Sequence, residues 1–163
     1  MEIELKRMTR EMCRELYSGW ENDEAIYMDM SLFRPYVYTQ EKADAYFDKR
    51  QEPSRVLLAI TLDDRVIGEV QLKNIDRDRK ECELSIHLQC DAYKGRGYGT
   101  RAERLAVSYA FDVLGMDAVN ADTVLKNTRS AHVLEKAGFR FLRQEGIFRY
   151  YRIEKNAREG AEK

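Results

Sequence analysis

The sequence predicts an α/β protein in which a mixed sheet is flanked by helices. Three observations support this fold class: helical segments follow an N-terminal strand, the spacing of apolar residues changes from helical to strand-like over residues 55–88, and strands and helices then succeed each other along the rest of the chain. A chain of 163 residues has the size of one domain, so we expect residues 1–163 to form a single folded unit.

The first third of the chain is predicted to begin with a strand and to continue with helices. Ile3 and Leu5 alternate with charged side chains, which is typical of a half-buried strand. Thr9 and Thr39 each precede a stretch with apolar residues at helical spacing, and threonine is a favoured N-cap. The elements predicted here are a strand over residues 2–8 and helices over 10–18, 22–30 and 40–51.

The rest of the chain is predicted to hold most of the sheet. Asp63-Asp64 separates two apolar runs and Glu145-Gly146 separates two more, so each pair of runs is expected to form a hairpin. Gly138 is placed to end a helix. The predicted strands cover residues 55–62, 66–74, 80–88, 118–124, 139–143 and 147–153, and the predicted helices cover 98–114 and 128–137.

Composition and charge argue against several classes of protein. A net charge of −1 provides no general attraction to nucleic acid or to an anionic membrane, so neither is an expected partner. The chain has no run of about 18 apolar residues that could span a membrane, and its N-terminal residues lack the apolar core of a signal peptide. The three cysteines form no CxxC motif and the two histidines lie far apart, so we expect neither a disulfide framework nor a metal site. Free thiols suit a reducing compartment, which predicts a cytoplasmic protein.

A glycine cluster lies between the strand predicted over residues 80–88 and the longest predicted helix. Closely spaced glycines let successive backbone N–H groups point at one ligand, and the helix that follows adds the positive end of its dipole. With two basic side chains beside them, these features predict a pyrophosphate-binding loop; the alternative is a tight turn with solvated basic residues. A Walker loop and a dinucleotide-binding fingerprint do not fit its composition and place in the chain. The cluster is Lys94-Gly95-Arg96-Gly97-Tyr98-Gly99-Thr100.

This cluster resembles the coenzyme A loop, Q/R-x-x-G-x-G/A, of the GNAT acetyltransferases, with Lys94 where that family usually has Arg or Gln. Further along, Asn127 and Ser130 precede Leu-Glu-Lys-Ala-Gly-Phe139, which is similar to the branch of ribosomal-protein N-terminal and polyamine acetyltransferases. The resemblance is clearest over residues 55–140. It implies a mixed, mostly antiparallel sheet of about six to seven strands and acetyl-CoA as cosubstrate, without a metal.

The resemblance also implies roles for individual residues. Backbone amides of the glycine cluster are expected to bind the pyrophosphate, and the strand that ends at Leu88 is expected to align the pantetheine arm. The backbone N–H of His87 corresponds to the group that polarises the thioester carbonyl. The ring of His87 is expected either to relay a proton or to pack as a structural side chain. Asn127 and Ser130 match positions that contact coenzyme A, and capping of the next helix is the other use of Asn127. The residues predicted to bind acetyl-CoA are His87, Leu88, Lys94, Gly95, Arg96, Gly97, Tyr98, Gly99, Thr100, Asn127 and Ser130.

Two residues are predicted to be catalytic, Glu83 and Ser130. Glu83 lies fourteen residues before the middle glycine of the cluster, the spacing at which the histone-modifying branch of the family carries its general base. Such a base removes a proton from an amine that is mostly protonated at neutral pH; alternatively, Glu83 is a solvent-facing residue on a half-exposed strand. Leu134 stands where many members carry a tyrosine general acid, so weight falls on Ser130 as the proton donor to the leaving thiolate. Tyr150 and Tyr151 are substitutes for that tyrosine or packing residues.

The function implied by the resemblance is an acetyl-CoA-dependent N-acetyltransferase. Its acceptor would be a primary amine, such as a protein N-terminus, a polyamine or another small amine, and transfer would proceed by direct attack. The alternative is a non-catalytic acyl-CoA-binding or sensing module. Dimers are common among the proteins that the chain resembles, so a homodimer is the expected assembly. An acidic cluster beside two aromatic residues is expected either to receive the cationic amine or to form a solvated loop, and comprises Glu21, Asp23, Glu24 and Asp29 near Trp20 and Tyr27.

Overall fold

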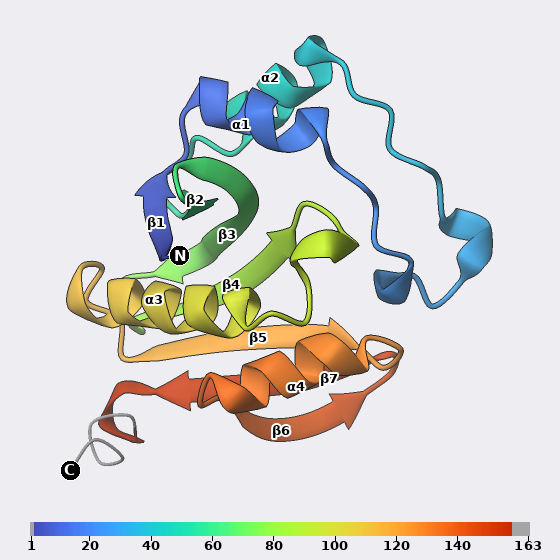
Figure 1. Ribbon diagram of the computed structural model, residues 1–163. Helices are drawn as coiled ribbons and strands as arrows, with labels where there is room; N and C mark the ends of the chain where they lie inside the picture. The colour runs from blue at the N-terminus through green and yellow to red at the C-terminus, as the bar shows by residue number, and fades with distance from the viewer. Residues whose placement is uncertain (1, 158–163) are drawn as a thin grey trace.

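The computed structural model describes residues 2–157, which fold around one seven-stranded sheet (Figure 1). The strand order is β1-β2-β3-β4-β5-β7-β6. β4 and β5 are parallel, and the other neighbouring strands are antiparallel, so the predicted mixed and mostly antiparallel sheet is confirmed. The strands are β1 (Ile3–Arg7), β2 (Val56–Leu62), β3 (Arg65–Asp76), β4 (Glu81–Leu88), β5 (Ala118–Val124), β6 (Arg140–Glu145) and β7 (Phe148–Glu154).

In the described part of the chain, four α-helices cover the two faces of this sheet. α1 and α2 pack against each other on one face, over apolar side chains of β2 and β3. α3 crosses the other face and α4 lies beside it. None of the described helices has the length and apolar character needed to cross a membrane. The helices are α1 (Arg10–Ser18), α2 (Gln40–Lys49), α3 (Tyr98–Asp112) and α4 (Thr128–Lys136), with 3₁₀ turns η1 (Glu24–Ile26), η2 (Met30–Leu32) and η3 (Asp91–Tyr93).

The alternation of side chains along β4 decides which groups reach each face. Leu84 and Ile86 belong to the core under α3, because they point to that face of the sheet. Ser85 and His87, at the intervening positions, therefore point to the face covered by α1 and α2. Glu69 of β3 lies directly across from His87, and cross-strand partners share a face, so it points the same way.

Most predicted elements are confirmed to within a few residues, and their ends have the expected causes. The hydroxyl of Thr9 accepts a hydrogen bond from the N–H of Met12, which starts α1 at the predicted residue. Asp63 and Asp64 both have positive φ, at 49° and 67°, as the hairpin between β2 and β3 requires.

The predicted helix over residues 22–30 is wrong. That segment forms two separate 3₁₀ turns, η1 and η2, joined by extended residues. Asp23 and Asp29 each accept a hydrogen bond from a backbone N–H two residues further on. Such local hydrogen bonds start a turn and compete with a continuous helix, so the acidic residues that suggested a helix instead divide the segment.

Candidate active site

A cleft opens where the two parallel strands separate. β4 and β5 are paired only from Glu81 with Ala118 to Glu83 with Asn120, and the strands diverge beyond that point. A cavity of about 850 Å³ lies in the opening. Its walls include Ser85, His87 and Asp122 from one face of the sheet, and Leu84 and Ala121 from the other. The cleft therefore passes through the sheet, between β4 and β5.

The glycine cluster stands at one end of this cleft, where α3 begins. Gly97 is the N-cap of α3 with φ of 84°, and Gly95 has φ of 73°, so both adopt the left-handed conformation that glycine allows. A Cβ atom at either position would have no neighbour within 4 Å, so open space lies in front of the backbone. The first N–H groups of α3 have no partner within the helix and lie at the positive end of its dipole. This arrangement fits a pyrophosphate group.

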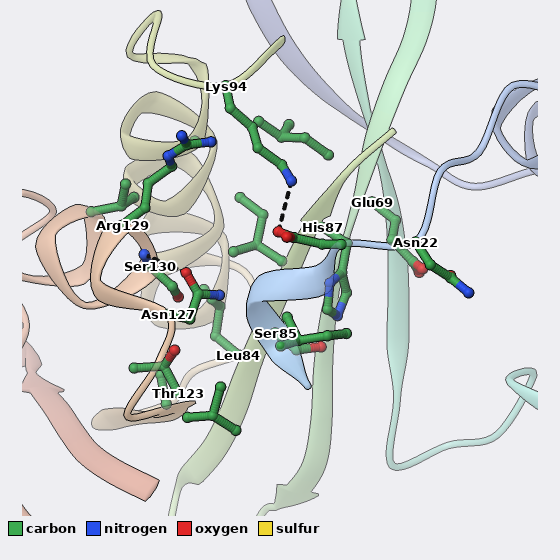
Figure 2. A pocket seen from close by; sticks show the side chains of 18 of the residues that line it. Asn22, Glu69, Leu84, Ser85, His87, Lys94, Thr123, Asn127, Arg129 and Ser130 are labelled. Atoms are coloured by element: carbon green, nitrogen blue, oxygen red, sulfur yellow. Dashed lines mark hydrogen bonds and ion pairs between the residues drawn. The ribbon is translucent and has the colours of Figure 1, made fainter. Parts of the chain in front are cut away.

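The cations near the loop are not equivalent. The Nζ atom of Lys94 lies 2.7 Å from a carboxylate oxygen of Asp23 and 2.9 Å from one of Asp91. Burial disfavours the charged form of Lys94, but the two carboxylates outweigh this effect and raise the pKa of Lys94. The side chain therefore keeps its positive charge, and the two carboxylates balance that charge. The Nε of Arg96 donates to the carbonyl of a residue in η3, which closes the loop on itself. Arg129, in the first turn of α4, lines the cleft next to Lys94 in Figure 2 and was not singled out by the sequence.

α4 presents the other predicted coenzyme A residues. Asn127 is the N-cap of α4, and its side-chain oxygen accepts the N–H of Ser130 at 3.1 Å. The capping role considered for Asn127 is therefore present, and both residues also line the cleft. Figure 2 shows them side by side, across the cleft from Ser85 and His87.

His87 and Leu88 present different groups to the cleft. The His87 ring lies 6.2 Å from that of Trp20, and burial lowers the pKa of His87, which keeps the imidazole neutral. The N–H of Gln89 donates to the carbonyl of Ile67 in β3 at 2.7 Å. Backbone groups of alternate residues turn to opposite neighbours, so the N–H of His87 also faces β3, whereas that of Leu88 faces the cleft. The thioester-polarising role predicted for His87 therefore suits the N–H of Leu88.

Glu83 and Asp122 are two carboxylates on the face of the sheet toward α1 and α2, and the charge of one affects the other. Glu83 is not among the residues that form the cleft wall, but Asp122 of β5 is. Burial raises the pKa of Asp122, and the negative charge of Glu83 raises it further. The carboxylate that reaches the cleft is thus Asp122, and Glu83 acts on it electrostatically.

A buried carboxylate closes the end of the cleft near α1 and α2. Glu69 is 1% exposed, and one of its oxygens accepts hydrogen bonds from the hydroxyls of Tyr17 and Tyr46. Its other oxygen accepts the side-chain N–H of Gln71 at 3.2 Å. The ring of Tyr17 stacks obliquely on those of Trp20 and Tyr46, each at 4.8 Å. A carboxylate among aromatic rings suits an ammonium group, through charge and cation–π attraction.

The structure brings together some of the predicted residues and leaves others outside the cleft wall. Leu134 also lines the cleft, whereas Tyr150 and Tyr151 do not. Within residues 2–157, no group of three or more His, Cys, Asp or Glu side chains is arranged to hold a metal ion. The predicted residues that line the cleft are His87, Leu88, Lys94, Gly99, Asn127 and Ser130. Those that do not are Glu83, Gly95, Arg96, Gly97, Tyr98 and Thr100.

This combination defines a class of protein: a mixed α/β fold whose sheet opens beside a helix start with the geometry to accept an anion. The family model described as the acetyltransferase (GNAT) domain matches residues 2–140, and the chain belongs to that family. The predicted family, and with it an enzyme that uses acetyl-CoA for acyl transfer, is confirmed.

Comparison with individual proteins agrees with this assignment. The chain is 40% identical over 87 residues to the probable N-acetyltransferase YjcK of Bacillus subtilis, a match that covers 53% of this chain and 46% of that protein. It is 27% identical over 137 residues to the spermidine N(1)-acetyltransferase of Escherichia coli, covering 84% and 72% of the two chains. Its fold matches a spermidine N-acetyltransferase from Vibrio cholerae, solved with CoA and spermine, with a TM-score of 0.77 at 17% identity over 95% of this chain and 96% of that one.

Proposed function

We propose that this protein transfers the acetyl group of acetyl-CoA to a primary amine by direct attack inside the cleft. The observation that carries the proposal is the passage of the cleft through the sheet. The start of α3 and the first turn of α4 lie toward one face, and the carboxylates Glu69 and Asp122 lie toward the other. Two substrates could therefore enter from opposite faces and meet between β4 and β5.

On the side of α3 and α4, the chain offers the groups that a coenzyme A molecule needs. The N–H groups at the start of α3 would bind the pyrophosphate, and the positive charge of Arg129 would assist. The N–H of Leu88, which faces the cleft, would donate to the thioester carbonyl and stabilise the negative charge that develops on the carbonyl oxygen. Ser130, at the cleft wall, is proposed to protonate the leaving thiolate. Acetyl-CoA itself supplies the activated acyl group.

On the side of α1 and α2, the cleft suits a cationic amine. An α-amino group, with a pKa of about 8, or a lysine-like amine, with a pKa of about 10.4, is mostly protonated at neutral pH and must lose a proton before attack. Glu69 and its aromatic neighbours would hold the ammonium group. The pair of Asp122 and Glu83 is proposed to remove the proton, directly or through a water.

Polyamines are the first acceptors to examine, because two of the relatives are spermidine acetyltransferases by name. The test is release of free thiol from acetyl-CoA in the presence of spermidine, spermine, peptides with free N-termini and aminoglycosides. We expect release above the hydrolysis rate with at least one of these amines. Binding of acetyl-CoA without release with any amine would indicate the non-catalytic binding module instead.

A matched pair of glycine variants tests the position of the coenzyme A loop. Gly97→Glu places a negative side chain in the open space before α3, so we expect loss of acetyl-CoA binding by calorimetry. Gly146→Glu is the control, because Gly146 also has positive φ, at 61°, and open space around a Cβ, but lies in the hairpin between β6 and β7. Similar loss of folding stability in both, with binding lost only in Gly97→Glu, is the expected result. Unchanged affinity in Gly97→Glu would contradict the loop assignment.

We also propose a cellular location, a domain organisation and a state of assembly for this protein. The cysteines Cys13, Cys82 and Cys90 are unpaired, which supports the predicted cytoplasmic location. We propose that the whole chain is one domain and that it self-associates. A spermidine N-acetyltransferase from Vibrio cholerae is dodecameric, and β6 of the present chain is an edge strand whose residues are all exposed. Light scattering of the purified protein tests self-association.

A further inference from the structure

Glu103 is a buried acid without a partner. Its side chain on α3 is 0% exposed, and neither carboxyl oxygen makes a hydrogen bond within the described residues. The other buried residues of α3 are apolar or aromatic, such as Ala102, Ala106 and Val107. An apolar side chain would therefore fill this position without the cost of burying an unpaired polar group.

The position of Glu103 connects it to the cleft. It lies four residues after Gly99, one helical turn further along α3, on the same side of the helix. Both residues line the cleft, together with Leu84 and Leu134, on the face of the sheet that carries α3 and α4. A molecule whose pyrophosphate lies at the start of α3 must pass this wall to reach the gap between β4 and β5.

The pantetheine arm of coenzyme A has the groups that such an acid can bind. It carries two amides and a hydroxyl, and each of these can accept a hydrogen bond. A protonated carboxyl offers one O–H donor and keeps acceptor capacity for an amide N–H. We propose that Glu103, in its protonated form, turns from its covered position in the free protein into the cleft and donates a hydrogen bond to the pantetheine arm of acetyl-CoA. This inference rests on the proposed function, because it assumes that acetyl-CoA occupies the cleft.

The protonation state follows from the surroundings of Glu103. Burial alone raises its pKa to about 8, and no neighbouring charge contributes to the shift. On this side of the cleft the charged side chains are Lys94 before α3, with its partner Asp23, and Arg129 on α4, whereas His87 on β4 and Asp122 on β5 line the cleft from the opposite face of the sheet. Lys94 stays charged, and His87 stays neutral, throughout the range in which Glu103 ionises. Glu103 is thus a donor at neutral pH and loses its proton in mildly alkaline solution.

The first experiment compares Glu103→Leu with the wild-type protein by calorimetry. Acetyl-CoA probes the whole molecule, and adenosine 3′,5′-bisphosphate probes its nucleotide end alone. We expect affinity for acetyl-CoA to fall roughly tenfold, as for loss of a buried hydrogen bond, with affinity for the bisphosphate unchanged. Without ligand, Glu103→Leu should unfold at a higher urea concentration than the wild type, because an unpaired polar group has been removed. Glu135→Leu, which removes an exposed carboxylate from α4, is the control and should bind both ligands as the wild type does.

A second variant keeps the inference testable if the leucine variant does not fold. Glu103→Gln retains a donor and an acceptor but cannot ionise. Wild-type affinity for acetyl-CoA, which has no free thiol to titrate, should fall between about pH 7 and about pH 9.5, and that of Glu103→Gln should stay constant.

The outcomes separate this inference from the proposed function. Failure of the wild-type protein to bind acetyl-CoA would overturn the function. Wild-type binding with equal affinity in Glu103→Leu, or equal losses for acetyl-CoA and the bisphosphate, would overturn the role of Glu103 alone. A wild-type pH profile identical to that of Glu103→Gln would overturn it as well.

Discussion

At the scale of single residues, the identity of the base depends on two neighbouring carboxylates. Glu83 has the sequence position of a general base, but Asp122 is the one that forms part of the cleft wall. The negative charge of Glu83 adds to the effect of burial on the pKa of Asp122. A carboxylate with a raised pKa holds a proton more readily, which favours Asp122 as the group that receives the proton of the amine.

These two roles predict different pH profiles. Asp122→Asn should lower kcat/KM by roughly 10²- to 10⁴-fold and remove the acidic limb of the pH–rate profile. Glu83→Gln should keep that limb but move it to lower pH, because the raised pKa of Asp122 relaxes toward its ordinary value. The measurement is kcat/KM against pH for both variants with one amine. If Glu83→Gln instead abolishes the limb while Asp122→Asn retains it, Glu83 itself is the base.

At the scale of elements, the separation of β4 from β5 leaves backbone groups of β4 without a strand partner. The N–H groups of Ile86 and Leu88 face the cleft, whereas those of Ser85 and His87 face β3. Of these four N–H groups, only those of Ser85 and His87 are covered by a neighbouring strand in the protein without ligand.

Amide hydrogen exchange tests this alternation. In the free protein, the amides of Ile86 and Leu88 should exchange faster than those of Ser85 and His87. On addition of acetyl-CoA, the first pair should become protected and the second pair, which is the internal control, should change little. Equal protection of all four amides before ligand is added would show that the strands do not open as described.

Elements were predictable from the sequence to the extent that their causes are local. Thr9 caps α1 through a residue three positions away, and the two aspartates of the β2–β3 hairpin adopt their turn without distant help. The segment around Asp23 was not predicted correctly, because its hydrogen bonds compete with the helical pattern. The rules for apolar spacing and helix capping do not weigh this competition. Its local cause is the side chain of Asp23, which accepts the N–H of Ala25 two residues further on.

The site was predictable only where one stretch of sequence contains it. The glycine cluster and the Asn127–Ser130 pair are such stretches, and residues of both line the cleft in which we propose that coenzyme A is bound. Glu69 and Arg129 reach the cleft from separate elements, and Asp23, one of the two partners of Lys94, lies 71 residues away in the chain. Glu103 could have been singled out from the sequence, because it is an acid among the apolar positions of a predicted helix.

At the scale of the whole molecule, the fold divides the cleft between two cores. One core lies under α3 and contains the larger set of apolar residues, and the other lies under α1 and α2. Because the cleft crosses the sheet, each core supplies one wall, and each wall includes one buried acid. Glu69 has hydrogen-bond partners on its side, and Glu103 has none on the other. Of these two buried acids, the one without a partner is therefore on the side proposed for acetyl-CoA.

The buried acid under α3 predicts how the stability of the folded protein depends on pH. The pKa of Glu103 is raised from 4.5 to about 8 in the folded state, so the folded protein binds the proton more tightly than the unfolded chain does. The contribution of this group is fully present below about pH 4.5, and it is lost as the pH rises toward about 8. A shift of this size corresponds to roughly 3 to 5 kcal/mol of unfolding free energy. Other carboxylates oppose the trend at low pH, so the quantity to measure is the difference in unfolding free energy between wild type and Glu103→Gln, from urea titrations at several pH values. Relative to the glutamine variant, the wild type should lose stability steadily between about pH 5 and about pH 8, and a difference that stays constant with pH would show that Glu103 is not buried as an acid.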